Sequence, residues 1–190
     1  MKAARDRPMQ SLPTAADILG FWRGLGPEKW FTRDLDVDAA IVSRFLSVHE
    51  SAAAGRLSDW ERTAEGSLAH VIVLDQFPRH MFRGTARAFA TDHLAHAVAA
   101  RAIASGFDRA FANPERRFFY LPFMHSEDLA DQERCIALCR AADDAEGVRH
   151  GEIHAHIIRS FGRFPHRNAT LGRATTPDEQ AFLDAGGFAG

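Results

Sequence analysis

Apolar residues recur at intervals of three or four along most of the chain, the spacing that places them on one face of a helix. Glycine and proline separate these segments. No stretch alternates apolar and polar residues over the length of a β-strand. The pattern therefore predicts an all-α protein of about eight helices stacked as antiparallel hairpins. The expected helices cover residues 14–23, 38–54, 58–74, 93–105, 114–121, 126–142, 146–161 and 177–185.

The segment 58–74 is the best candidate for the central helix. Leu68, Val71 and Leu74 belong to a run that is apolar nearly all round, as in a helix surrounded by others. Ser58 and Glu61 form a capping-box pattern at its start. Pro78 follows and cannot donate the next backbone hydrogen bond. The helix is therefore expected to end just before it.

Other helix ends are marked by capping residues. Thr14 with Asp17, and Thr176 with Glu179, have the spacing of a capping box. Gly162 follows the segment 146–161 and is expected to end it. Further boundaries are predicted at Asp36 or Asp38, which would cap the second helix, at Thr91 or Asp92, at Asn113–Pro114, and at Pro122, where the chain would break or kink.

Length and charge narrow the class of protein. With 190 residues, the chain fits a single helical domain over residues 14–190, preceded by a flexible tail over residues 1–13. A net charge of −2 argues against a nucleic-acid binder. No apolar run approaches membrane-spanning length, and the N-terminus lacks an apolar signal segment. Cys135 and Cys139 are expected to pack within a helix. These features favour a cytoplasmic protein without membrane or nucleic-acid partners, and leave its oligomeric state open.

The first candidate site follows the central helix, where three arginines recur at four-residue spacing after a carboxylate and an amide. Asp75 and Gln76 could preorganise arginines for an anionic ligand, because guanidinium groups bind carboxylate and phosphate through paired hydrogen bonds. Alternatively, Asp75 pairs with one of the arginines and only ties down a loop. The candidate ligand-binding residues here are Asp75, Gln76, Arg79, Arg83 and Arg87.

Two further segments carry candidate chemistry. His125 lies in apolar company beside Glu127, and is either a structural histidine or a general acid or base. The second segment surrounds Gly162 and Pro165. It could hold a phosphate or carboxylate, or it could pin a turn through hydrogen bonds to carbonyls. Its candidates are His154, Arg163, His166, Arg167 and Asn168, with His166 a further candidate for proton transfer.

The histidine spacing gives little support for a metal site. His150 and His154 lie on one helix face, but the segment reads HGEIH and lacks the HExxH zinc motif. No phosphate-binding loop, dinucleotide fingerprint or serine nucleophile motif occurs. Neither a metal nor a cofactor is therefore predicted.

Four long motifs resemble the domain-of-unknown-function family numbered 924, which occurs in bacteria and eukaryotes. They are LDQFPR (74–79), FRGTARAFATD (82–92), YLPFMHSEDLADQE (120–133) and FGRFPHRNATLGR (161–173). The resemblance starts near Ala15, and implies a tetratricopeptide-like helical superhelix but no reaction. His80 departs from the usual asparagine and Arg23 from the usual aromatic residue.

Three hypotheses about function follow. In the first, the three polar segments meet at one pocket for a small anionic ligand, with His125 or His166 moving protons and Glu127 or Asp75 orienting an imidazole. In the second, the helical hairpins bind a protein or peptide through a groove with exposed Trp30, Phe31 and Phe89. In the third, the polar motifs are structural networks that lock loops against helices. The first is favoured; whether a reaction is catalysed is left open.

Overall fold

The computed structural model describes residues 12–188, and within them it is all-α, with no β-strand. Most of the predicted N-terminal tail lies outside the described residues. The α-helices are α1 (Ala15–Leu25), α2 (Pro27–Trp30), α3 (Leu35–Ala53), α4 (Ala64–Val71), α5 (Phe77–Met81), α6 (Asp92–Ala104), α7 (Leu121–Met124), α8 (Leu129–Ala141), α9 (Ala145–Phe161) and α10 (Pro177–Asp184). The 3-10 helices are η1 (Ser58–Arg62), η3 (Ala86–Phe89), η4 (Phe107–Ala110), η5 (Glu115–Phe119) and η6 (Pro165–Arg167), and η2 (Ile72–Gln76) is a π helix.

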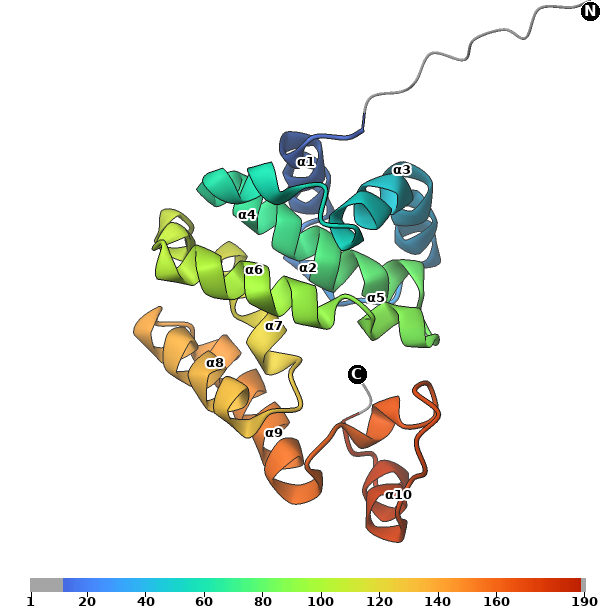
Figure 1. Ribbon diagram of the computed structural model, residues 1–190. Coiled ribbons are helices and arrows are strands. Elements are labelled where there is room, and N and C mark those ends of the chain that lie inside the picture. Colours follow the sequence, from blue (N-terminus) through green and yellow to red (C-terminus); the bar gives the residue numbers. More distant parts are fainter. Residues whose placement is uncertain (1–11, 189–190) are drawn as a thin grey trace, which may run out of the picture.

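The helices stack in layers along the molecule (Figure 1). Helices α1 and α3 pack against the continuous segment α4–η2–α5, and α6 packs on it from another side. Helix α7 connects α6 to the antiparallel hairpin α8–α9. The chain then turns back after α9, and residues 163–184, which include η6 and α10, form a segment that we call the hook (Figure 1). The all-α prediction is confirmed, whereas the tetratricopeptide-like superhelix stays a prediction.

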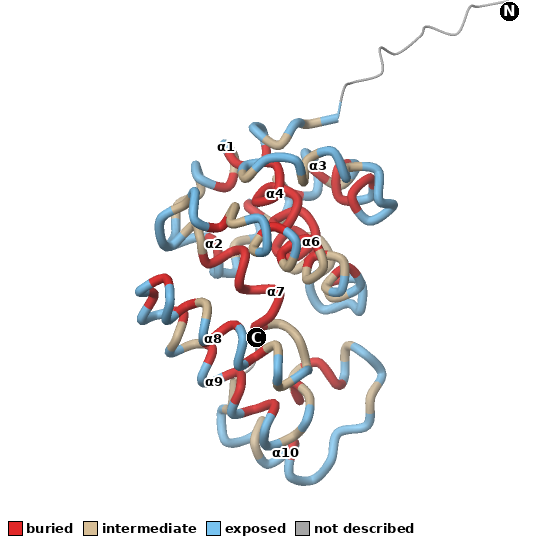
Figure 2. The backbone as a smooth tube through the Cα atoms, turned by 60° about the vertical axis from the view of Figure 1, so that its left-hand side comes forward, coloured by how far each residue is buried: buried red, intermediate tan, exposed pale blue. Residues whose placement is uncertain are grey.

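The central segment is confirmed as the most buried part of the chain. Burial is continuous from Gly66 to Pro78, and this segment runs through the middle of the upper layers (Figure 2). The predicted end before Pro78 is wrong. The chain widens into the π helix η2 and continues as α5, with Pro78 inside its first turn.

The π helix accommodates Pro78 because other donors serve the carbonyls near it. The Thr91 hydroxyl donates to the Leu74 carbonyl oxygen at 2.6 Å. In an α-helix that oxygen would accept from residue 78, which as proline has no N–H. His49 Nδ1 lies 3.1 Å from the Val73 carbonyl oxygen. The helix therefore continues through Pro78 with the Val73 and Leu74 carbonyl oxygens paired. Asp75 and Gln76, which lie in this segment, are buried in the interior.

Several helix ends differ from the prediction. Asp34, and not Asp36 or Asp38, caps α3, because its carboxylate accepts from backbone N–H groups of the first turn. Thr63 caps α4, so residues 58–62 form a 3-10 helix instead of the start of that helix. Asn113 does not cap a helix; its amide donates to the Ala142 carbonyl oxygen at 2.8 Å. The capping boxes at Thr14 and Thr176 and the helix end at Gly162 are confirmed, and Gly162 adopts the left-handed conformation.

The apolar core has two parts. The larger fills the space between α1, α3, α4, α6 and α7, where Trp22, Phe45 and Phe77 are buried. The smaller gathers Ile157, Ile158 and Phe164 between α9 and the hook. Phe77 of the larger part belongs to the first polar segment, and Phe164 of the smaller part belongs to the third.

Candidate functional site

A buried carboxylate and an imidazole form the centre of the candidate site. Asp75 is fully buried in η2, and its Oδ1 lies 2.8 Å from Nδ1 of His125, which follows α7. Gln76 donates its amide to the other carboxylate oxygen. Residues fifty positions apart therefore meet as an aspartate–histidine pair, in which the carboxylate fixes the orientation of the ring.

The charges around this pair determine its protonation. Burial alone would raise the pKa of Asp75, but Arg79 and then His125 more than offset it, so the pKa lies well below its ordinary value. For His125, burial and then Arg79 lower the pKa, and Asp75 opposes them only in part. The pair at neutral pH is therefore an ionised aspartate and a neutral histidine.

Arg79 connects this pair to α6. Its guanidinium donates to both carboxylate oxygens of Asp92, at 2.9 and 3.0 Å, and to the Asp75 carbonyl oxygen. It also lies 3.3 Å from Oδ1 of Asp75. Arg79 is thus held by two carboxylates, so it positions the site rather than offering open hydrogen-bond donors.

Arg167, in η6, has few partners for a buried arginine. It is 7% exposed, and its guanidinium lies between the rings of Phe89 and Phe164, at 4.7 and 4.5 Å. It donates one hydrogen bond among the described residues, from NH1 to the His125 carbonyl oxygen at 3.1 Å. Asp92 lies 3.7 Å from the same nitrogen, and Nε has no partner. Burial, and then repulsion from Arg79, lower the pKa of Arg167 to about 10.

Two further histidines lie beside Arg167. His154 and His166 pack against the rings of Phe164 and Phe188, with ring centroids 4.5 to 5.5 Å apart. Burial is the main cause that lowers both pKa values to about 4. Both imidazoles are therefore neutral at pH 7. The structure thus brings together Asp75, Gln76, Arg79, His125, His154, His166 and Arg167, which we call the central cluster.

Glu127 lies close to this cluster but holds the loop instead of an imidazole. It accepts from both terminal nitrogens of Arg173, at 2.7 and 3.0 Å, and from the Phe164 backbone N–H at 2.8 Å. Asp75, and not Glu127, orients His125. Both carboxylates were candidates for that role in the sequence, and only the tertiary contacts separate them.

Arg163 and Asn168 belong to a separate network in the hook. Arg163 donates to both carboxylate oxygens of Glu179, at 2.6 and 2.9 Å, and Asn168 donates to the same carboxylate at 3.1 Å. Glu179 is also the capping-box residue of α10. These two predicted ligand-binding residues therefore contact the start of α10, which matches the loop-pinning alternative.

Arg83 and Arg87 also point away from the central cluster. Arg83 donates to both oxygens of Asp38 at 3.0 Å, and His80 Nδ1 lies 2.7 Å from the same carboxylate. Arg87 stacks on the ring of Phe82 at 3.8 Å. Of the three regularly spaced arginines, only Arg79 reaches Asp75. Arg83, in the turn after α5, instead bonds to Asp38 of α3, as the structural alternative expects.

Three residues of the site were not identified from the sequence. Asp92 pairs with Arg79, Phe89 covers Arg167, and Arg173 holds Glu127. In the sequence, Asp92 is interpreted as a helix cap and Phe89 as an exposed residue of a peptide-binding groove. The matched motifs contain all three residues, but nothing in their spacing indicates these contacts.

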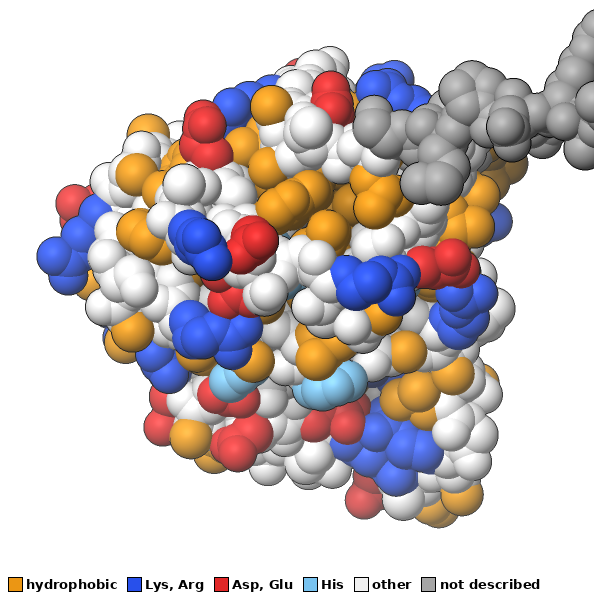
Figure 3. Space-filling view, turned by 45° about the horizontal axis from the view of Figure 1, so that its top comes forward, with side chains coloured by type: hydrophobic (Ala, Val, Ile, Leu, Met, Phe, Trp, Pro, Cys, Tyr) orange, Lys and Arg blue, Asp and Glu red, His pale blue; other side chains and the backbone are white. Residues whose placement is uncertain are grey.

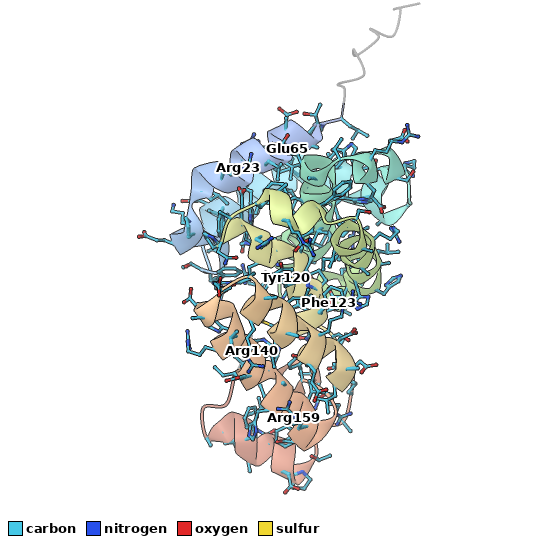
Figure 4. The ribbon with its side chains drawn as sticks, turned by 90° about the vertical axis from the view of Figure 1, so that its left-hand side faces the viewer. Arg23, Glu65, Tyr120, Phe123, Arg140 and Arg159 are labelled. Atoms are coloured by element: carbon cyan, nitrogen blue, oxygen red, sulfur yellow. The ribbon has the colours of Figure 1, made fainter. Side chains whose placement is uncertain are left out.

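The surface hollows of the described chain include two that lie away from the central cluster. One, of about 350 Å³, lies along the α8–α9 hairpin, where Figure 4 labels Arg140 and Arg159. The other, of about 410 Å³, borders Arg163 and the start of α10. His125 of the central cluster directly follows α7, the helix at which Figure 4 labels Phe123. Basic and acidic side chains are interspersed over the face in Figure 3, without a continuous basic stripe there.

Neither a membrane span nor a metal-binding group is found in residues 12–188. No helix there combines the length and apolar character needed to cross a bilayer. No three histidine, cysteine, aspartate or glutamate side chains in this part of the chain are grouped as metal ligands would be.

Residues 18–187 match the model of a bacterial protein family of unknown function, DUF924. The chain belongs to this family. It is also similar to the solved structure of a protein of unknown function from Agrobacterium tumefaciens, with 47% sequence identity and a TM-score of 0.87. The match covers 90% of this chain and 97% of the other. No curated protein matches the chain.

Proposed function

We propose that this DUF924 protein binds a small anionic ligand at the central cluster, with Arg167 as the main anion-binding group and His125 as the proton acceptor. One observation carries the proposal. Arg167 is buried between two aromatic rings with one hydrogen bond among the described residues, whereas a buried guanidinium normally engages most of its five donors. A carboxylate or phosphate would supply the missing acceptors.

The neighbouring groups fit this role. Arg79 is already paired with Asp92 and Asp75, so it does not compete with Arg167 for the ligand. His125 is neutral, and Asp75 holds its Nδ1, which leaves Nε2 to accept a proton from a bound molecule. Arg163, Arg83, Arg87, Asn168 and Glu127 have protein partners elsewhere and are not part of the proposed site.

The peptide-binding alternative has less support. It expected Trp30, Phe31 and Phe89 to be exposed along a groove. Trp30 is 5% exposed in the core, and Phe89 packs on Arg167, so Phe31 is the one of the three that is largely exposed. A single exposed ring does not define a groove.

Inorganic phosphate provides the first test. We expect phosphate, added at constant ionic strength against chloride, to raise the Tm of the wild-type protein. At one hundred times its Kd, it would add about 2.7 kcal/mol to the free energy of unfolding, which is a rise in Tm of roughly 5–10 °C for a protein of this size. Isothermal titration calorimetry then measures the Kd directly.

Arg167→Gln is expected to abolish this rise, and Arg83→Gln serves as the control because Arg83 is paired with Asp38 outside the site. If phosphate leaves the wild-type Tm unchanged, or if Arg167→Gln binds phosphate as the wild type does, the proposed function is wrong. A low Tm of Arg167→Gln without phosphate, together with no phosphate effect on the wild type, would instead support the structural alternative.

A further inference from the structure

The hydrogen-bond partner of His125 fixes which of its nitrogens carries the proton. An ionised aspartate can only accept, so Nδ1 of His125 must donate to Oδ1 of Asp75, 2.8 Å away. Because the ring is neutral, its Nε2 then carries a lone pair. At this position the protein presents a hydrogen-bond acceptor and not a donor.

The same reasoning applies to His154 on α9. Its Nδ1 lies 2.8 Å from the carbonyl oxygen of His150, which also can only accept. The pKa of about 4 keeps the ring neutral at pH 7, chiefly because the ring is buried. Nε2 of His154 is therefore a second acceptor with a fixed tautomer.

Neither Nε2 has a hydrogen-bond partner among the described residues, and neither is among the side-chain atoms that are sealed from solvent without a partner. The His125 side chain is 15% exposed. A bound molecule can therefore reach both nitrogens. Unpaired acceptors next to an arginine with spare donors indicate a ligand that both accepts and donates hydrogen bonds.

Contacts through Arg167 place the two acceptors in one neighbourhood. NH1 of Arg167 donates to the His125 carbonyl oxygen, and the guanidinium stacks on Phe164 at 4.5 Å. The ring of Phe164 lies 5.5 Å from that of His154. Besides burial, the charge of Arg167 lowers the pKa of His154, which agrees with this proximity.

An anion without a hydroxyl group would pair with the donors of Arg167 but not with the two Nε2 acceptors. Its oxygens accept from Arg167, but it displaces water from the two Nε2 atoms without replacing the lost hydrogen bonds. A buried acceptor left unpaired is costly, and this cost is how polar sites reject ligands that lack a hydroxyl group.

We propose that the ligand is a small carboxylate or phosphate that also carries a hydroxyl group, which donates to Nε2 of His125 or His154. This proposal rests on the anion site proposed above and specifies its ligand class. The anionic group accepts hydrogen bonds from Arg167, and the hydroxyl donates to one of the two imidazoles.

Ligand pairs of equal charge test the hydroxyl separately from the anion. The full-length protein is titrated calorimetrically at pH 7 with malate against succinate, and with glycerol 3-phosphate against propyl phosphate. Both enantiomers of each chiral ligand are used. We expect one enantiomer of the hydroxylated member to bind about tenfold more tightly in at least one pair, the effect of one well-placed hydrogen bond. The pair that shows the effect identifies the head group.

The variant His154→Phe removes the acceptor but keeps an aromatic ring against Phe164 and Phe188. With His125→Phe as the second variant, at least one should lose the tenfold preference while still binding the ligand without a hydroxyl. His156→Phe is the matched control, because His156 is exposed on the same helix. Thermal unfolding of each variant shows that the fold is intact.

The outcomes distinguish the two proposals. If succinate or propyl phosphate binds but neither hydroxylated partner binds more tightly, the ligand class is wrong and the anion site stands. An undiminished preference in both His125→Phe and His154→Phe also overturns the ligand class. If none of the ligands binds, both proposals fail.

Discussion

At the scale of single residues, the central cluster depends on which charges are buried together. Asp75 and Arg79 could not remain ionised in the interior alone, because an unpaired buried charge is far costlier than a paired one. Asp92 and His125 complete the set, so each charged group has an opposite charge or a hydrogen-bond donor within reach. Arg167 has the fewest partners of these buried charged groups, and it therefore marks the candidate ligand position.

The neutral state of His154 makes stability depend on pH. Its pKa is about 4 in the folded protein and near 6.5 when unfolded, so between these values the unfolded chain binds more protons. The stability associated with the neutral His154 is therefore present in full above pH 6.5 and is lost as the pH falls towards 4. We expect acidification from pH 7 to pH 5 to lower the free energy of unfolding of the wild type by about 2 kcal/mol through His154.

Urea unfolding at the two pH values measures this cost by comparison with His154→Phe, which cannot titrate there. The loss of stability on acidification should be smaller in this variant by that amount, and unchanged in the control His156→Phe. Equal losses in the wild type and His154→Phe would show that His154 is not held neutral.

At the scale of elements, the π helix η2 determines where the polar residues point. It appears where Pro78 interrupts the regular ladder, and π turns are often found at functional sites. Without the wider turn, the side chains after it would be rotated on the helix, and Asp75 would not meet both Arg79 and His125. The local backbone and the site therefore depend on each other.

The Thr91 hydroxyl is expected to stabilise this element. Thr91→Val removes the donor to the buried Leu74 carbonyl oxygen and should lower the free energy of unfolding by about 1–3 kcal/mol. Thr85→Val is the control: its hydroxyl also bonds a carbonyl, that of Phe82, but the residue is exposed. Urea denaturation measures both. Equal effects of the two substitutions would contradict a special role for Thr91.

At the scale of the whole molecule, the candidate site lies where two cores meet. The layers around α4 supply Asp75 and Arg79, α7 supplies the backbone next to His125, and α9 with η6 supplies His154 and Arg167. The hook supports the last of these segments. Its own network, centred on Glu179, holds the loop on which Arg167 lies.

Disruption of that network should loosen the hook without unfolding the layers. In Glu179→Gln, Arg163 loses its carboxylate partner, so amide hydrogen exchange in residues 163–184 should become faster by roughly an order of magnitude while α4 and α6 stay protected. Glu133→Gln is the control, since its contact with Arg159 is long and exposed. Uniformly faster exchange throughout the protein would show that the hook is not a separate unit.

The sequence alone determined the elements whose causes are local. Helical spacing, the capping boxes at Thr14 and Thr176, and the helix end at Gly162 depend on neighbouring residues, and all were predicted correctly. The central position of the segment around Leu68 also followed, because a helix that is apolar all round must be surrounded. That the three polar segments form one pocket stays a prediction: Asp75, His125 and Arg167 lie close together, whereas Arg83 and Arg163 pair elsewhere.

Only the tertiary structure decided which partners these residues take. Arg79, Arg83 and Arg87 are equivalent by spacing, yet one meets Asp75, one meets Asp38 and one stacks on Phe82. Asp75 and Glu127 were equal candidates to orient His125 until the packing of α7 and the loop separated them. Pro78 did not end its helix, because His49 and Thr91, distant in sequence, supply hydrogen bonds to the carbonyls. Such pairings depend on contacts between residues far apart in the chain, and local patterns do not encode them.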